Sequence, residues 1–390
     1  MRLPCFFIII SLLLFSFACQ NTSPDYNFGG ANVTNYTESV QLNYARSLSF
    51  SIDSTFNIDR IRAIIPFQQA EGQAALAILN RRNIYLYNTA EATPYRIIKL
   101  QKEGPNGIGP MGSFDGLAVV APDTFYFVSN STSMMYRLNG SGELLQKEII
   151  PIASEQSTVY GNVLNPLRTA GNQLIIPAYG FTAARNFTQI PTAYVYDVRT
   201  HTFQGAFHYP KLYNQAYWGY HTFMRWSAVT YNPATDEYYV SYAIDPNVYV
   251  YDNNFRLKAQ KTLGSTHFTA IEPQHPNAQL RFDNGGISGE NNQAYFMRTS
   301  YFAGAFYHST LQYYMRICRI GKDENSGRGV QFSIIIADRN LNKVGEFLLP
   351  SHYVYETFFL TEDGIALLNM DKYDASENTI VFDVLSFSEM

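Results

Sequence analysis

The sequence predicts an all-β protein: a six-bladed β-propeller of four-stranded antiparallel blades, with its ring closed by the N-terminal strand. The main observation is a repeated run of alternating apolar and aromatic residues, because such residues favour the pleated, half-buried surface of a strand. Allowing for long loops, the spacing of the runs matches the blade repeat of propellers, about 40–50 residues with four strands each. The alternative is a β-sandwich with chance similarity between strands. The six runs end at Asn88, Asn139, Asp197, Asp252, Asp338 and Asp383.

Composition agrees with packed sheets. The chain has 390 residues, of which 46% are hydrophobic and 15% aromatic, with 30 Tyr and 28 Phe. Charged residues make up only 15%, against about a quarter in typical soluble domains. The formal net charge of −4 carries none of the basic surplus that nucleic-acid binding requires, so no nucleic-acid partner is expected.

The N-terminal region predicts export and lipid anchoring. Arg2 precedes an apolar run that is too short to span a bilayer and has the layout of a signal peptide. Ser16-Phe17-Ala18-Cys19 resembles a bacterial lipobox, although Ser16 stands where Leu is usual, and ordinary signal cleavage remains the alternative. We therefore expect a signal peptide at 1–18, a lipidated Cys19 with a flexible tether at 19–39, and the propeller at 40–390, on an outer membrane. The side of that membrane and the oligomeric state are left open.

Only Cys318 remains in the mature part of the chain after Cys5 and Cys19 are assigned to the signal and the lipid. A disulfide within the mature chain is therefore excluded. Cys318 lies in a strand-like run, and we expect a buried, inert thiol.

The strands can be assigned in order along the chain. Residues 44–53 have no neighbour in sequence to pair with, and we expect them to form the outer strand of the last blade. Blade one follows at about residues 60–100. The expected strands are 116–120, 124–128, 134–139 and 143–150 in blade two, 173–179, 192–197 and 202–209 in blade three, and 225–231, 237–243, 247–252 and 256–263 in blade four.

Blades five and six are assigned in the same way, although blade five is interrupted. We expect a strand at 294–299, a long insertion at 300–329, and then strands at 330–338 and 343–349. Blade six holds 353–360, 364–370 and 378–385, and lacks a fourth strand of its own. The N-terminal strand fills that vacancy.

Loop lengths divide the propeller into two unlike faces. The joints between first and second strands, and between third and fourth strands, are tight. Long loops instead join one blade to the next or join second strands to third strands, and in an up-and-down blade both kinds open on the same face. Functional residues concentrate on loops held by a rigid scaffold, so we expect the site on this long-loop face. The long loops are 101–114, 151–166, 180–191, 210–224, 264–278 and 300–329.

Motifs of common enzyme classes are absent from the sequence. Residues 107–112 match G-x-G-x-x-G, but Pro110 lies inside the motif and a strand follows it where a dinucleotide site needs a helix. The glycines more simply allow a tight passage between blades. The seven histidines lack metal-ligand spacing, and no G-x-S-x-G nucleophile elbow occurs. We expect no metal and no cofactor.

One polar and aromatic cluster contains both tryptophans of the chain and is the predicted ligand-binding site. Aromatic faces beside polar groups suit sugars, peptides or other amphipathic ligands. The alternative is that these aromatic rings pack between blades three and four. The cluster consists of Tyr217, Trp218, Tyr220, His221, Arg225 and Trp226.

A second group of polar residues is expected at the central channel. Asp115, Arg225 and Arg298 lie on or beside expected inner strands and can point into it. Buried ion pairs are the alternative interpretation for these side chains.

A resemblance supports the same architecture. Residues 103–114, with the strand residues 125–127 and 135–138, resemble NHL-type and TolB-like six-bladed propellers. Together with the lipobox, residues 40–390 resemble the uncharacterised propeller lipoproteins of Bacteroidetes-type bacteria, and residues 356–365 are similar to their last blade. The resemblance implies a fold and an envelope location but no activity.

The sequence thus favours a cell-envelope lipoprotein that acts as a non-catalytic binding module for a peptide, glycan or partner protein. The alternative is a propeller enzyme, a lyase or a glycoside-active protein, with its site in the central channel. Titratable groups converging on a pocket would favour the enzyme, whereas an aromatic face would favour binding.

Overall fold

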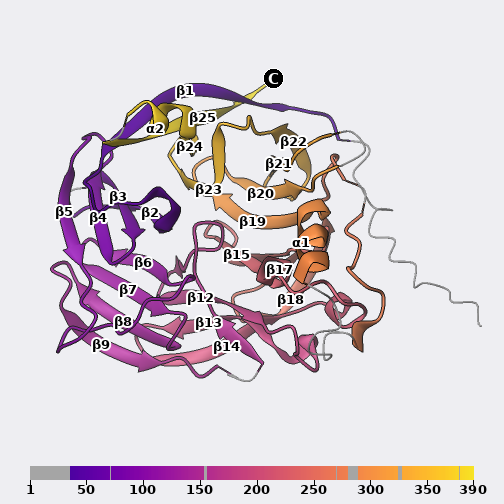
Figure 1. Ribbon diagram of the computed structural model, residues 1–390, viewed down its shortest axis with the longest axis horizontal. Coiled ribbons are helices and arrows are strands. Elements are labelled where there is room, and N and C mark those ends of the chain that lie inside the picture. Colours follow the sequence, from indigo (N-terminus) through magenta and orange to yellow (C-terminus); the bar gives the residue numbers. More distant parts are fainter. Residues whose placement is uncertain are drawn as a thin grey trace, which may run out of the picture.

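The computed structural model is a six-bladed β-propeller in which six twisted sheets surround a central channel (Figure 1). This confirms the predicted fold class. The structure describes residues 36–70, 72–152, 156–268, 270–279, 289–323, 327–376 and 378–390. The expected signal peptide, Cys19 and most of the tether lie outside the described residues.

The first three blades follow each other along the chain. From the innermost strand outward, blade one is β2 (Ile61–Gln68), β3 (Ala74–Asn80), β4 (Asn83–Asn88) and β5 (Pro94–Lys99), and blade two is β6 (Gly116–Ala121), β7 (Thr124–Ser129), β8 (Met134–Asn139) and β9 (Leu144–Ile149). In blade three, two short strands, β10 (Ser157–Val159) and β11 (Arg168–Ala170), pair with β12 (Gln173–Gly180), which is followed by β13 (Pro191–Asp197) and β14 (Thr202–His208).

The last three blades complete the ring. Blade four is β15 (Ser227–Asn232), β16 (Glu237–Tyr242), β17 (Asn247–Tyr251) and β18 (Leu257–Thr262), and blade five is β19 (Tyr301–His308), β20 (Tyr313–Ile320), β21 (Gln331–Ala337) and β22 (Lys343–Leu348). Blade six is β23 (Tyr353–Leu360), β24 (Gly364–Asn369), β25 (Thr379–Glu389) and the N-terminal strand β1 (Val40–Ser51).

The repeated run with its final Asp or Asn is the third strand of each blade. In five blades this residue caps the turn into the fourth strand, because its side-chain oxygen accepts backbone N–H groups two to four residues ahead. Asp252, for example, accepts from Asn254 N at 2.9 Å and from Arg256 N at 2.8 Å. The sixth, Asp383, lies within β25 instead. No turn follows it, since the fourth strand of blade six comes from the other end of the chain.

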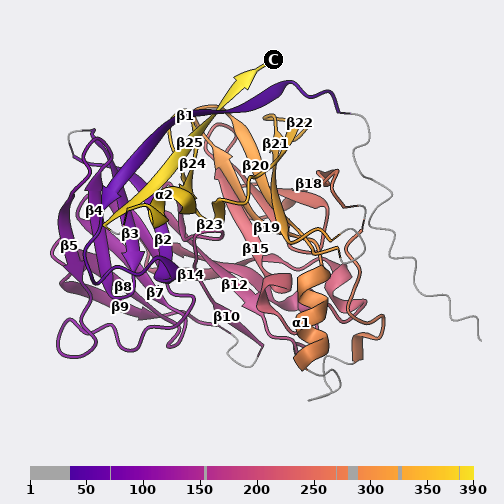
Figure 2. The same cartoon turned by 45° about the horizontal axis from the view of Figure 1, so that its top comes forward.

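The ring closes where β1 pairs with β25. The pairing is antiparallel, runs from Val40↔Glu389 to Ser51↔Thr379, and contains one bulge. The N-terminal strand therefore supplies the outer strand of blade six, as predicted, although it begins four residues earlier than expected. Figure 2 shows β1 lying along β25 across the top of the ring. Phe50, fully buried, packs against Tyr87 of blade one and Phe382 of blade six.

Blade five corrects the sequence assignment. Residues 294–299 are not a strand: they fall at the end of helix α1 (Gly289–Arg298), where Tyr295 and Thr299, one turn apart, are both buried. Residues 300–329 are not a loop insertion, because they contain β19 and β20. Every residue of β19 is buried, so the strand reads as a continuous apolar run without the alternation that would mark it. Cys318 lies in β20 and is fully buried, as expected.

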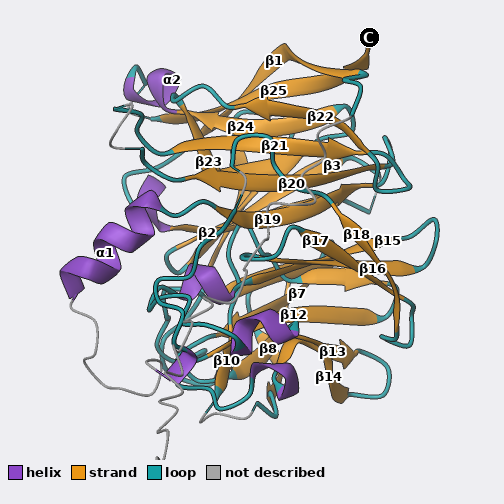
Figure 3. Ribbon diagram, turned by 90° about the vertical axis from the view of Figure 1, so that its right-hand side faces the viewer, coloured by secondary structure: helices purple, strands orange, loops and turns teal. Residues whose placement is uncertain are grey.

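The two faces of the ring differ as predicted. Figure 3 shows the helices gathered on one side of the strands, with short turns on the other. This long-loop face carries α1, α2 (Met370–Asp374) and the 3-10 turns η1 (Ile58–Arg60), η2 (Phe187–Gln189), η3 (Lys211–Asn214) and η4 (Thr222–Arg225). No helix in the described part of the chain is long and apolar enough to cross a membrane.

Ring closure predicts a stability difference between two aromatic residues of β1. Phe50→Ala should lower the free energy of unfolding by about 3–5 kcal/mol, because it leaves a cavity between blades six and one. Tyr44→Ala is the control, since Tyr44 is 59% exposed on the same strand, and should cost at most about 1 kcal/mol. Urea unfolding of both variants measures the difference. Equal stabilities would contradict the role assigned to β1.

Candidate functional site

The cluster predicted from sequence mainly fixes the conformation of the long loop that leads into blade four. Arg225 is 4% exposed and donates to three backbone carbonyls: Nε to Gly180 O at 2.9 Å, Nη1 to Gly219 O at 2.9 Å and Nη2 to Tyr220 O at 3.0 Å. The hydroxyl of Tyr209 donates to Arg225 O. Arg225 therefore ties the loop to blade three, and its guanidinium group is engaged with backbone carbonyls.

The aromatic residues of this cluster separate into buried and exposed members. Tyr217 and Trp218 are buried, and the Trp218 indole Nε1 donates to Leu212 O at 3.2 Å. The expectation that Trp218 is an exposed interface ring is therefore wrong, and the inter-blade packing alternative describes it better. Tyr220 is 67% exposed, and His221 stacks on Phe296 of α1 with ring centroids 4.3 Å apart.

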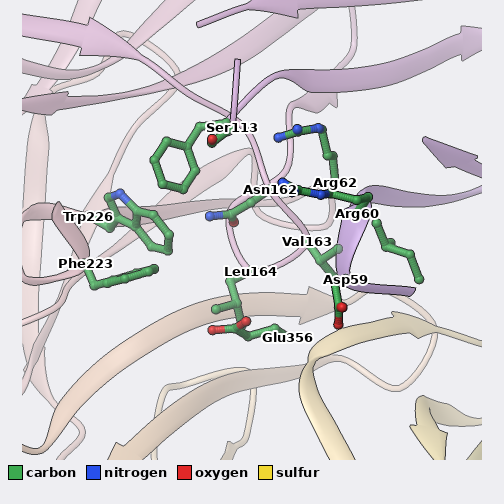
Figure 4. Close-up of a pocket in the computed structure, with 12 residues that line it drawn as sticks. Asp59, Arg60, Arg62, Ser113, Asn162, Val163, Leu164, Phe223, Trp226 and Glu356 are labelled. Carbon is green, nitrogen blue, oxygen red and sulfur yellow. The ribbon is translucent and has the colours of Figure 1, made fainter. Parts of the chain in front are cut away.

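A cavity of about 250 Å³ lies at the mouth of the central channel on the long-loop face. Its walls come from five blades, because most of its lining residues stand just before or at the start of an inner strand. Figure 4 shows Phe223 and Trp226 on one side, Arg60 and Arg62 on the other, and Asn162 between them. The lining residues are Asp59, Arg60, Ile61, Arg62, Ser113, Phe114, Asn162, Val163, Leu164, Phe223, Trp226 and Glu356.

Two irregularities in inner strands supply charged residues to this cavity. In β2 the pairing passes from Ile61↔Asn80 to Ala63↔Leu79, so Arg62 is an extra residue. In β23 the pairing passes from Val354↔Leu368 to Phe358↔Leu367, which leaves 355–357 unpaired with β24. Bulges re-aim side chains and are frequent beside functional sites. Here they place Arg62 and Glu356 on the cavity wall.

The short turn η1 holds Asp59 and Arg60 at the cavity. Asn57 caps η1 by accepting from Asp59 N at 3.0 Å through its side chain. Asn80, which is fully buried, in turn fixes Asn57: Asn57 N donates to Asn80 Oδ1 at 3.1 Å and Asn80 Nδ2 donates to Asn57 O at 2.6 Å. The charged turn is thus anchored to the core of blade one.

The opposite wall is aromatic. Trp226 is 3% exposed and stacks on Tyr160 with centroids 5.3 Å apart and an interplanar angle of 15°. Phe223 and Phe114 meet its ring edge-on at 4.3 Å and 5.6 Å. Phe223 remains partly exposed and is the ring that a ligand can contact. Of the sequence-predicted cluster, Trp226 alone lines this cavity.

Loop 161–165 brings a polar group between these walls. Asn165 N donates to the side-chain oxygen of Asn162 at 2.7 Å, which orients the Asn162 amide. The loop lies directly on inner strand β6, where Gly161 and Gly116 meet: a Cβ at Gly161 would approach the Cα of Gly116 to 2.5 Å. Glycine is therefore required for this contact.

Two nitrogen donors on the cavity walls have no partner among the described residues. Both Arg62 Nε and Trp226 Nε1 are buried atoms without a hydrogen bond. Leaving a buried donor unsatisfied costs about 1–3 kcal/mol, so such groups are rare unless they serve another purpose. Both nitrogens belong to residues that line the cavity, and they are two of ten buried side-chain polar atoms without a partner in the described part of the chain.

Asp115 supports the charge of Arg62 from behind the cavity. Burial raises the pKa of Asp115 to about 6, while Asn130 N and Gly112 N, which donate to its two oxygens, and the nearby Arg62 and Arg82 act in the opposite direction. Its carboxylate is fully buried and occupied by backbone donors. Arg298, also expected at the channel, is instead exposed at the end of α1.

Comparison with known proteins places the chain in a family. Residues 39–348 match the family described as "Domain of unknown function (DUF4221)". The chain belongs to the DUF4221 family. A DUF4221 member from Bacteroides vulgatus has the same fold, with a TM-score of 0.74 at 15% identity over 91% of this chain and 100% of the other. The "Putative exported protein" of Bacteroides fragilis gives a TM-score of 0.55 at 12% identity over 90% and 95% of the two chains. No curated protein matches the chain in sequence.

The family assignment agrees with the resemblance to uncharacterised propellers.

Most of the residues that line the cavity were not predicted from the sequence. Arg60 and Arg62 stand at the start of the first inner strand, and a search for charged residues at the starts of all inner strands would have found them. The bulges that aim Arg62 and Glu356 have no comparable signal in the sequence. Among the described residues no cluster of His, Cys, Asp or Glu could hold a metal ion.

The burial of Trp218 in this DUF4221 protein predicts a structural role for it. Trp218→Ala should cost about 3–5 kcal/mol of stability, because it removes a buried ring and its hydrogen bond to Leu212 O. Tyr220→Ala, two residues away but exposed, should stay within about 0.5 kcal/mol of the unchanged protein. Chemical unfolding compares them. A Trp218→Ala variant as stable as the Tyr220→Ala variant would return Trp218 to the list of surface anchors.

Proposed function

We propose that this protein is a non-catalytic binding module of the bacterial cell envelope that takes a small ligand into the channel mouth of its long-loop face. The observation that carries the proposal is the cavity at the channel mouth, where charged, amide, hydroxyl and aromatic side chains from five blades converge. Such a concave site with a few convergent polar groups beside an aromatic wall is typical of small-ligand binding.

The arrangement favours binding over the alternative, a lyase or glycoside-active enzyme. General acid–base catalysis is most efficient when a titratable group within reach of the substrate has a pKa near the operating pH. The group behind this cavity whose pKa is shifted toward neutrality is Asp115, but both of its oxygens accept backbone N–H groups and it does not line the cavity. Rigid donors beside an aromatic wall are instead typical of recognition.

The envelope location rests on the N-terminal sequence and on one relative. Arg2, the apolar run and Cys19 have the layout of a lipoprotein signal. A structural neighbour carries the description "Putative exported protein", which is consistent with export. We propose that Cys19 bears lipid and that residues 20–39 tether the propeller to the outer membrane.

The binding proposal predicts ligand-dependent stabilisation that a filled cavity abolishes. A ligand bound only by the folded state adds about 2.7 kcal/mol of stability at 100 times its dissociation constant, so a panel of glycans, peptides and small acids can be screened by thermal melting. Ser113 is exposed at the cavity, and Ser113→Trp should block every response. Ala234→Trp adds an indole to an exposed tight turn and is the control. Responses that persist in Ser113→Trp would exclude the cavity as the binding site.

The anchoring proposal is tested by Cys19→Ser. The variant should lose lipid labelling and leave the membrane fraction for the soluble fraction, because the acceptor thiol is removed while the propeller is unchanged. Cys318→Ser is the matched control and should stay with the membrane. Membrane association of Cys19→Ser equal to that of the unchanged protein would contradict lipid anchoring.

A further inference from the structure

We propose that the cavity recognises a single acidic sugar unit, a ring that carries one carboxylate and several hydroxyl groups. This inference deepens the proposed binding function and depends on it. It follows from the charge, the mixture of donors and acceptors, the aromatic wall and the size of the cavity, and each of these limits the ligand in a different way.

The positively charged wall selects an anionic group. Arg62 makes no hydrogen bond or ion pair with any described residue, and Arg60 beside it is exposed at the same cavity. Two neighbouring guanidinium groups repel each other. Burial lowers the pKa of Arg62 and Arg60 adds to that effect, while the buried Asp115 acts in the opposite direction. A carboxylate between them offsets the repulsion and matches the planar fork of an arginine with two parallel hydrogen bonds.

The acidic residues of the cavity limit that anion to a single negative charge. Asp59 and Glu356 also line the cavity. The two positive and two negative charges of its lining residues therefore sum to zero. A phosphate or a polyanion would meet these carboxylates as like charges, whereas hydroxyl groups can donate to them. The Tyr355 hydroxyl donates a hydrogen bond to Oε1 of Glu356 and so fixes the orientation of the carboxylate. Its other oxygen, Oε2, is then available to accept from a ligand hydroxyl.

The uncharged polar groups extend this mixed pattern. Asn162 offers an amide whose Nδ2 makes no hydrogen bond to a described residue, and the exposed Ser113 offers a hydroxyl. The cavity thus presents both donors and acceptors, with Ser113 coming from blade two and Asn162 from blade three. A sugar hydroxyl both donates and accepts, so a ring bearing several of them satisfies such a pattern better than a zwitterion with one donor end and one acceptor end.

The aromatic wall and the size of the cavity favour one ring. Phe223 presents a partly exposed face opposite the arginines, and the apolar face of a sugar ring packs against such a surface. The volume of about 250 Å³ lies below the range of about 300–1,000 Å³ for sites that enclose drug-sized ligands. One ring with its substituents fits inside, and any further units of a glycan would extend out of the channel mouth.

The test measures binding of D-glucuronate and D-galacturonate to the mature protein by titration calorimetry, with D-glucose and D-galactose as neutral counterparts. We expect binding of an acid that is at least 10-fold tighter than that of its neutral sugar, and a loss of about 10–100-fold in Arg62→Gln. Arg339→Gln, at an exposed arginine on the tight-turn face, should bind as the unchanged protein does. Uronate disaccharides distinguish a glycan terminus from a free sugar: tighter binding of the disaccharide identifies the terminus.

Stability separates a ligand contact from a structural role for Arg62. Because its Nε is unpaired and its charge is desolvated, Arg62→Gln should melt at the same temperature as the unchanged protein or higher. If the variant is instead unfolded, Arg60→Gln on the same wall replaces it, since Arg60 is exposed. Loss of acid binding without loss of stability supports the inference.

Four results would overturn the inference, and they have different consequences for the proposed function. Equal binding of acidic and neutral sugars would refute the acidic-sugar assignment but keep the binding function. The same holds if the uronates do not bind while another ligand class gives responses that Ser113→Trp abolishes. Acid binding that is unchanged in both arginine variants would refute the role of this wall. Absence of any response that depends on Ser113 would refute the proposed function together with the inference.

Discussion

The closing blade is held by one buried carboxylate on which the ring depends. Asp383 in β25 accepts from Ser47 of β1 at 2.6 Å, from Asn369 of β24 at 2.8 Å and from Tyr353 of β23 at 3.2 Å, so it joins all four strands of blade six. Lys372 of α2 donates to it at 2.7 Å and neutralises its charge. A satisfied buried network of this kind defines one register, whereas a network missing a member is costly. The strand that is most distant in sequence is thereby fixed to the end of the chain.

Buried arginines perform a comparable task on the long-loop face. Long loops carry backbone carbonyls that no sheet pairs, and a guanidinium group can satisfy several of them at once. Arg316 is fully buried and donates to Ser241 Oγ and to four carbonyls, from Tyr242, Asp245, Pro246 and Leu263. Arg319 caps the end of α1 through Phe296 O and Thr299 O, and Arg225 braces the loop before blade four. Arg62 differs from all three because it makes no such bond. Arg137 and Arg168 also have a buried Nε without a partner, so the case for Arg62 rests on its place in the cavity wall.

Sequence patterns predicted the parts of this protein that are set by local chemistry. The Asp or Asn that ends a third strand caps the following turn through local hydrogen bonds, and it does so in five blades. Asp383 is the exception, because the fourth strand of its blade comes from the N-terminus and no turn follows. Blade five was missed where burial on both faces removes the alternation in β19. The cavity was missed because it depends on register: Arg62 and Glu356 reach it through bulges, and pairing register is a property of two strands together. The burial of Tyr217 and Trp218 could not be decided from the sequence, because aromatic composition does not distinguish a loop core from a ligand surface.

The charged half of the cavity lies at the seam where the ring closes. Asp59, Arg60 and Arg62 belong to blade one and Glu356 to blade six, and the chain passes from β1 through η1 directly into β2. The same segment therefore closes blade six and then delivers the arginines to the channel. The inner strands β2 and β23 also pack against each other directly, so this contact and the pairing of β1 with β25 together hold blade one beside blade six. The charged half of the cavity is thus built where the first and last blades meet, and a ligand that bridged Arg62 and Glu356 would add its binding free energy to the stability of the folded ring.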